Sequence, residues 1–354
     1  MSATVATRRS TGATRRVREP LVSRGSAMLI MAVFTVYFLL PLWWLLVASS
    51  KDTGDILTTN PLWFADFRLF ANIGDLFAYR DGIYLRWLGN SLLYAGLGGA
   101  IATLLAAMAG YALAKYRFPG REFLFNVVLG GVLVPATALA LPLFLIFSQV
   151  QLTNTFWAVF LPSLVSPFGV YLARIFAASS VPDELLEAAR LDGSGEIRTF
   201  FTVSMRLMTP ALVTMFLFQF VAIWNNFFLP LIMLRSEELF PVVYGLYNWN
   251  NQLNQLPELR GLVLIGALLS VIPLIVTFLL LQRFWRNGLG AGALKGAGRR
   301  AARPRGPAPP APPAPPHPQH HIASMKGIEM HAKKKAAAVI AISLVLTAVF
   351  VPTA

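Results

Sequence analysis

The side chains that could do chemistry are concentrated in one short charged stretch, Glu187-Ala188-Ala189-Arg190-Leu191-Asp192-Gly193. Pro182, Asp183 and Glu184 before it are typical of a helix start, because proline fits the first turn and acids face the positive end of the helix dipole. Gly193 is typical of the residue just past a helix, where a left-handed backbone is needed. The stretch therefore predicts a helix that ends at a glycine.

A second short helix is predicted to follow that glycine. Six side chains share one face at helical spacing: Ile197, Phe200, Phe201, Ser204, Leu207 and Met208. Two short helices joined at a glycine form a rigid, protruding elbow. On a membrane protein, an elbow of this kind is predicted to be a segment to which a partner protein docks.

Other reactive groups are missing or lie far from this stretch. The chain has no cysteine, which excludes a disulfide, a thiolate nucleophile and a thiolate metal site. No lysine follows a glycine, so a Walker loop for ATP is also excluded. All histidines lie in the C-terminal tail, at His317, His320, His321 and His331. We expect no catalytic residue, no metal and no cofactor in this chain.

The composition is that of a membrane protein. Of 354 residues, 56% are hydrophobic and 13% are charged, unlike an ordinary soluble domain of this length. A net charge of +14 would suggest nucleic acid in a soluble protein. Here the basic residues gather at the two ends and in alternate loops, which is the pattern of membrane topology. We therefore expect a lipid bilayer as a partner and no nucleic acid.

Long apolar runs predict six membrane spans, because about 20 helical residues cross the hydrocarbon core. The expected spans are 27–49, 90–114, 123–150, 155–176, 211–234 and 261–282, the third bent at Pro135 or Pro142. The connecting segments are a basic cytoplasmic tail (1–26), an extracytoplasmic loop (50–87), the elbow (177–209) and a cytoplasmic end of the core (285–296).

Lysine and arginine counts place the N-terminus, the elbow and the end of the core in the cytoplasm. We expect the spans to contain no Asp, Glu, Lys, Arg or His side chain. That absence argues against a proton- or sodium-coupled secondary carrier and against a membrane enzyme with acid–base residues.

The segment 297–354 has a different composition. It begins with a spacer of alternating proline and alanine and ends in a basic, then apolar run from Met330 that resembles a signal peptide. One interpretation is a seventh span or tail anchor. The other, which we favour, is a reading frame that runs into the start of a neighbouring gene.

Several motifs resemble the permease subunits of ATP-binding-cassette (ABC) importers. Glu187-Ala188-Ala189, then Asp192-Gly193 and a distant Pro210, resemble their signature loop. Four further motifs occur in the order of the smaller of the two maltose-type membrane subunits: Asn90-Ser91-Leu92, Arg117-Phe118-Pro119-Gly120, Trp224-Asn225-Asn226 and Gly290-Ala291-Gly292-Ala293-Leu294-Lys295-Gly296. Two positions depart from the pattern, Ser194 in place of alanine and Arg206 in place of proline.

The resemblance implies an all-α polytopic membrane protein with a six-span, type I importer core, a permease domain over 88–284 and a cytoplasmic coupling elbow. It implies a multi-pass subunit of the cell (inner) membrane that moves a carbohydrate inward. The implied partners are a second permease subunit, two copies of an ABC ATPase that holds ATP and Mg, and an extracytoplasmic solute-binding protein. A permease for glycerol phosphate, or a secondary carrier, is the alternative.

The elbow residues expected to couple to the ATPase are Glu187, Ala188, Ala189, Asp192 and Gly193. The alanines allow close backbone approach, the acids offer charge-assisted contacts, and the glycine lets the chain reverse without strain.

Two polar groups outside the elbow each have two interpretations. Gln219, Trp224, Asn225 and Asn226 either join helices by hydrogen bonds within the membrane or line a path for a hydroxyl-rich solute. Tyr247, Asn248 and Trp249 lie in an outer loop, where they either anchor at the membrane interface or contact the binding protein, as the resemblance implies.

Overall fold

The computed structural model describes the backbone of residues 21–300 and the side chains of residue 26 and residues 28–284. Every regular element in that range is helical. The first half contains α1 (Leu21–Ser49), α2 (Asp55–Thr58), α3 (Leu69–Ala78), the 3-10 turn η1 (Tyr79–Gly82), α4 (Ile83–Leu92), the π turn η2 (Leu93–Leu97), α5 (Gly98–Lys115), α6 (Arg121–Leu133) and α7 (Ala136–Gln149).

The second half contains the elbow and the last helices. They are α8 (Phe156–Ser163), α9 (Pro167–Ser180), α10 (Asp183–Leu191), α11 (Glu196–Thr199), the π turn η3 (Phe200–Ser204), α12 (Met205–Leu207), α13 (Thr209–Trp224), α14 (Phe228–Met233), the 3-10 turn η4 (Glu237–Leu239), α15 (Val242–Asn251) and α16 (Leu259–Arg300).

Four stretches are long and apolar enough to cross a membrane: Met28–Ser49, Leu69–Lys115, Phe156–Ser180 and Leu259–Phe284. Two bent pairs raise the number to six if each counts as one span. They are α6 with α7, bent by 101°, and Glu196–Leu207 with α13, bent by 84°. The chain is an all-α polytopic membrane protein in its described part.

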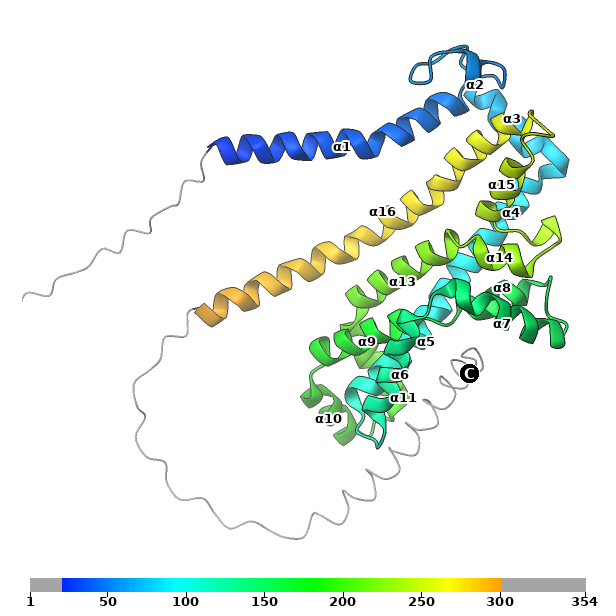
Figure 1. The fold of residues 1–354 in the computed structure, drawn as a ribbon. Coiled ribbons are helices and arrows are strands. Elements are labelled where there is room, and N and C mark those ends of the chain that lie inside the picture. The colour runs from blue at the N-terminus through cyan, green and yellow to red at the C-terminus, as the bar shows by residue number, and fades with distance from the viewer. Residues whose placement is uncertain (1–20, 301–354) are drawn as a thin grey trace, which may run out of the picture.

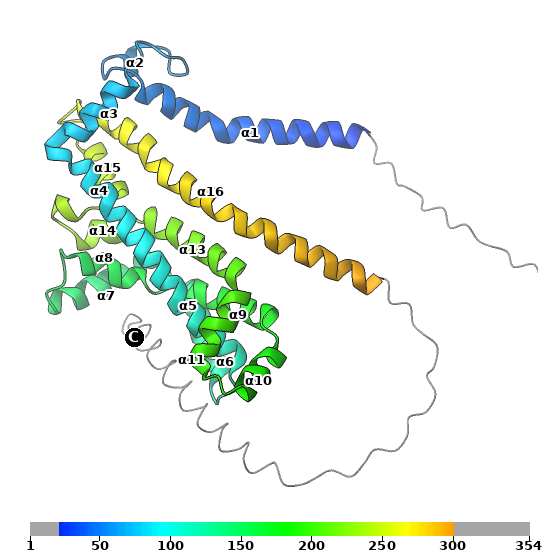
Figure 2. The same ribbon diagram turned by 180° about the vertical axis from the view of Figure 1, so that it is seen from behind.

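Two long helices diverge from the others. Figures 1 and 2 show α1 and α16 running out from the end that carries α2 and α3, although α16 also packs on α3, α13 and α15. α5 contacts both α9 and α13, and its glycines allow the closest approach. A Cβ added at Gly110 would lie 2.4 Å from the Cβ of Ala173, so only glycine fits where α5 crosses α9.

The end far from the elbow has an aromatic core. Trp87 of α4 and Trp249 of α15 are buried with ring centroids 4.5 Å apart, and Tyr79 meets Trp249 edge-on at 5.3 Å. The Trp87 indole N–H also donates to the carbonyl of Glu237 at 2.7 Å. These contacts tie α4 to the segment before α15, so the outer loop is packed against the helices at this end.

Three details differ from the sequence expectation or refine it. The loop expected at 50–87 contains α2 and α3, and α3 packs on α16. The single span expected at 211–234 is two helices, because α13 ends at Trp224 and α14 begins at Phe228. The bend in the third span falls at Pro135, which precedes α7 in an extended conformation. Residues 1–20 and 301–354, with most of both predicted tails, lie outside the described residues.

Candidate functional site

The first arm of the elbow is α10. It begins at Asp183, directly after the extended Pro182, and carries Asp183 and Glu184 in its first turn. Leu186 is buried against the helices behind it, whereas Leu191 at the end of the arm is 90% exposed. α10 is therefore held by one leucine and shows an apolar tip.

Gly193 makes the turn of the elbow, with φ at +77°. Its N–H donates to the Arg190 carbonyl at 3.0 Å, and the Ser194 N–H donates to the Ala189 carbonyl at 2.9 Å. This pair of bonds is the Schellman helix ending. A Cβ at position 193 would meet nothing within 4 Å, so backbone conformation rather than space favours glycine here. The predicted left-handed glycine is confirmed.

The second arm is one helical run, Glu196–Leu207, with a π turn in its middle. Phe200, Ser204 and Met208 of the predicted face are buried, whereas Ile197, Phe201 and Leu207 are exposed. The face is therefore covered on one side only. Only the side of the arm that faces α5 is covered, because the elbow stands at the edge of the packed helices.

Two residues at the end of α5 hold both arms. The Tyr116 hydroxyl donates to Glu196 Oε2 at 2.6 Å, and Arg190 Nε donates to Glu196 Oε1 at 2.9 Å. Lys115 Nζ donates to the Val181 carbonyl and, at 2.8 Å, to Asp183 Oδ1. The Glu196 carboxylate thus joins α5, α10 and α11.

The protonation of this junction is set by burial and by the carboxylate. Burial raises the pKa of the Tyr116 hydroxyl, and the bond to Glu196 raises it further. The hydrogen bond to Glu196 also raises the pKa of Arg190. Tyr116 therefore donates as a neutral phenol at physiological pH, and Arg190 keeps its charge.

The five predicted coupling residues lie together on α10 and the turn after it. Glu187, Ala188, Asp192 and Gly193 are exposed and Ala189 is half-buried. Neither Glu187 nor Asp192 has an ion-pair partner among the described residues. Two uncompensated carboxylates beside an exposed leucine suit a basic, partly apolar partner surface.

The residues of the candidate solute path are brought together only in part. Gln219 Nε2 donates to the Ser163 carbonyl at 3.2 Å, which joins α13 to α8. Trp224 is 1% exposed and stacks on Phe220. Asn225 and Asn226 sit in the break after α13, where Asn225 is exposed and Asn226 accepts from the Leu229 N–H. Asn225 is the exposed member of this group, and its amide donates to the Val221 carbonyl at 2.9 Å.

The outer-loop residues lie on α15 and differ in exposure. Tyr247 is 39% exposed and Asn248 is half-buried. Trp249 is 1% exposed and lies inside the aromatic core. Of the two aromatic residues, only Tyr247 is therefore accessible from the surface in this conformation.

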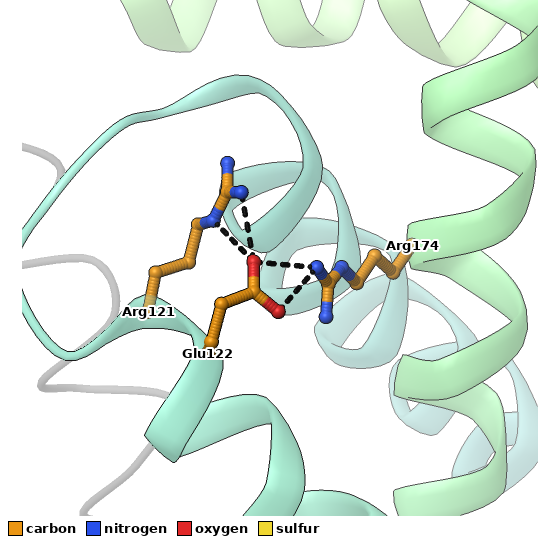
Figure 3. A network of polar contacts seen from close by, with 3 residues as sticks. All are labelled: Arg121, Glu122 and Arg174. Carbon is orange, nitrogen blue, oxygen red and sulfur yellow. Dashed lines mark hydrogen bonds and ion pairs between the residues drawn. The ribbon is translucent and has the colours of Figure 1, made fainter.

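Four important residues were not singled out from the sequence. Lys115, Tyr116 and Glu196 act through contacts between distant segments, for which the sequence holds no local signal. Arg174 lies inside the predicted span 155–176, so the expectation that the spans carry no charged side chain is wrong for this span. Figure 3 shows its guanidinium facing Glu122, with bonds of 2.8 and 2.9 Å to the two carboxylate oxygens.

Among the described residues no group of three His, Cys, Asp or Glu side chains could hold a metal ion. The elbow is instead an exposed, acidic turn that Lys115 and Tyr116 attach to the end of α5.

Comparison with known proteins shows the family to which this chain belongs. Residues 102–287 match the family described as binding-protein-dependent transport system inner membrane component, and the chain belongs to that family. It is 34% identical over 257 residues to the arabinooligosaccharides transport system permease protein AraQ of Halalkalibacterium halodurans, covering 72% of this chain and 91% of the relative. It is 30% identical to the lactose transport system permease protein LacG of Rhizobium radiobacter, covering 78% and 97%.

A solved structure has the same fold. It is a bacterial ABC transporter involved in the import of the acidic polysaccharide alginate, which superposes with a TM-score of 0.66 at 22% identity over 75% of this chain and 97% of that one. The chain is thus a multi-pass membrane permease of the ABC-importer type.

Proposed function

We propose that this chain is one of two permease subunits of an ABC importer that carries a mono- or oligosaccharide into the cell. The observation that carries the proposal is the elbow, whose exposed carboxylates and leucine face away from the membrane helices. Relatives named for arabinooligosaccharides and lactose support a carbohydrate as the substrate.

In this proposal the elbow docks into a cleft of a separate ABC ATPase, which binds ATP and Mg and performs the hydrolysis. Closure of two ATPase copies would move α10. Because Lys115 and Tyr116 tie both arms to α5, the displacement would reach the membrane helices as a rigid movement rather than be lost in a flexible loop. The solute path between the membrane helices would then open outward, where an extracytoplasmic binding protein delivers the sugar.

Orientation follows from the same assignment. The elbow lies in the cytoplasm with the N-terminus, and α15 faces outward with Tyr247 as a contact for the binding protein. The exposed amide of Asn225 is our candidate for a hydrogen bond to a sugar hydroxyl. A permease of the same type for glycerol phosphate remains the second candidate for the solute.

The test is recovery of the ABC ATPase that co-purifies with the full wild-type chain. Glu187→Lys should reduce that recovery about tenfold or more, since it reverses a charge in a docked contact, and Glu187→Ala should reduce it less. Glu258→Lys is the matched control, because Glu258 is also exposed but directly precedes α16, whose start lies far from the elbow.

Equal recovery with Glu187→Lys and Glu258→Lys would refute the docking role. Sugar uptake into proteoliposomes that contain the permease subunits without the ATPase separates the importer from a secondary carrier. We expect no concentrative uptake there.

A further inference from the structure

A shallow surface cavity of about 340 Å³, wide open to the outside, lies where α5 leads into α6. Its lining consists of Arg117, Phe118, Gly120, Arg121, Glu122 and Phe123. It is at the same end of the molecule as the elbow, because Lys115 and Tyr116, just before it in the chain, contact Asp183 and Glu196. Neither the candidate solute path nor the coupling residues contribute to it.

The charges around the cavity are positive in balance. Glu122 is the only acid in the lining, and its carboxylate already accepts bonds from Arg121 and from Arg174 behind it (Figure 3). Arg117 is exposed and has no ion-pair partner among residues 28–284. Arg117 and Arg121 of the lining and Arg174 behind it, counted against the one carboxylate of Glu122, leave two positive charges uncompensated, so the cavity favours an anion.

The surface next to the cavity is apolar. Phe123, in the first turn of α6, is 74% exposed, and Val127, one turn further along the same face, is 48% exposed. A small soluble anion would leave this stripe uncovered, whereas a ligand with an anionic head and a long apolar tail would cover both features.

We propose that this cavity binds the phosphodiester headgroup of an anionic phospholipid, with an acyl chain lying along Phe123 and Val127 of α6. Arg117 and the unbonded nitrogen of Arg121 hold the phosphate, and basic pockets beside membrane helices on the cytoplasmic side are suited to such headgroups. The assignment of this end to the cytoplasmic leaflet rests on the proposed function. The charge and shape of the cavity do not depend on the proposed function.

The experiment uses the full chain purified in a neutral detergent. Phosphatidylglycerol, phosphatidylcholine or inorganic phosphate is added, and bound lipid per chain is counted by native mass spectrometry. Phosphatidylglycerol should reach half-saturation at a lower concentration than phosphatidylcholine. Arg117→Gln should raise its half-saturation concentration about fivefold, the change expected for one basic side chain at a membrane surface. Arg117→Glu should raise it further.

Arg206→Gln is the matched control, since it removes another exposed arginine, on the elbow, that does not line the cavity. It should bind phosphatidylglycerol as the wild type does. Wild-type binding by the Arg117 variants, or equal binding of phosphatidylcholine, overturns the proposal. Displacement of the lipid by millimolar inorganic phosphate would instead assign the cavity to a free anion and overturn the lipid. Because lipid is counted on the isolated chain, failure of ATPase coupling cannot alter the result.

Discussion

Tyr116 and Glu196 are 80 positions apart in the chain, and the hydroxyl of the first donates to the carboxylate of the second at 2.6 Å. Tyr116 is the residue directly after α5, and Glu196 begins α11. Arg190, near the end of α10, bonds the other oxygen of the same carboxylate. One acidic side chain thus fixes the angle between the two arms of the elbow and ties both to a long membrane helix.

Replacing Tyr116 by phenylalanine should weaken this junction, because the hydroxyl is lost while the aromatic ring stays in place. Tyr116→Phe removes one donor to a charged acceptor, a loss of about 1–2 kcal/mol at a partly buried site. We expect ATPase docking to remain near normal and sugar transport per ATP hydrolysed to fall severalfold. The measurement is transport and ATPase activity on the same proteoliposomes. Tyr171→Phe, on α9 away from the elbow, is the control, and equal coupling in both variants would contradict the role.

The junction should also show a defined pH dependence. Burial and the Glu196 bond raise the pKa of Tyr116 above its ordinary value of 10.0. A raised folded-state pKa means that the stabilisation is fully present below the unfolded pKa, near 10, and is lost as pH rises through the folded pKa. Wild-type coupling should therefore not change between about pH 7 and 9 through this group. The difference between wild type and Tyr116→Phe should stay constant over that range.

Substitutions at Gly193 test the effect of backbone strain alone, because a side chain there would meet no crowding. Its φ of +77° is costly for residues with a Cβ, and no atom lies within 4 Å of a Cβ placed there. Gly193→Asn should keep the turn, because asparagine tolerates a left-handed backbone. Gly193→Val should cost about 2 kcal/mol or more and redirect α11. Co-purification of the ATPase and ATP-coupled transport should be lost in the valine variant and largely kept in the asparagine variant, with both chains equally abundant in the membrane.

The sequence predicts the local structure of this elbow, but not the contacts that attach it to α5. Proline, two acids and a glycine at helical spacing predict α10 and its ending, since each acts within a few residues of the backbone. The bond from Tyr116 to Glu196 depends on how α5 meets α11 in space. No pattern of neighbouring residues encodes that distance.

The same limit applies to the aromatic residues and to charge within the spans. Tyr247 and Trp249 are two positions apart and equally aromatic, yet one is exposed and the other buried, because only Trp249 faces Trp87. Hydropathy averages over a span conceal Arg174, whose charge is met by Glu122 on the neighbouring helix. Six apolar runs predict six spans, whereas the described helices give four, or six if each bent pair counts as one span. The runs also do not show that α13 ends at Trp224 before a separate α14.

Trp249 should be needed for folding of the outer loop, and Tyr247 for contact with the binding protein. Trp249→Ala removes a fully buried indole and should cost about 3–5 kcal/mol, seen as a lower thermal midpoint. Trp249→Phe should be far milder, since the buried indole N–H has no hydrogen-bond partner among the described residues. Tyr247→Ala should leave the midpoint unchanged and lower transport driven by the binding protein. A large stability loss in Tyr247→Ala would exclude a contact role.

Arg174 should hold α6 against α9 through two different contacts. Its guanidinium pairs with Glu122 on one side, and its Cζ lies 3.8 Å from the centroid of the Phe125 ring on the other. Arg174→Lys keeps the charge but loses the flat stacking surface, a contact of about 0.5–2 kcal/mol. Arg174→Gln loses the charge as well. We expect the thermal midpoint of the full chain to fall in the order wild type, Arg174→Lys, Arg174→Gln.

Glu122→Gln provides the matched comparison for that series, because it removes the ion pair and leaves the stacking on Phe125 intact. It should therefore lower the midpoint less than Arg174→Gln. The double variant Glu122→Gln with Arg174→Gln should fall by less than the sum of the two single changes, since both remove the same pair. Full additivity would mean that Glu122 and Arg174 do not interact in the membrane. A midpoint for Arg174→Lys equal to that of the wild type would mean that the ring of Phe125 contributes nothing to the contact between α6 and α9.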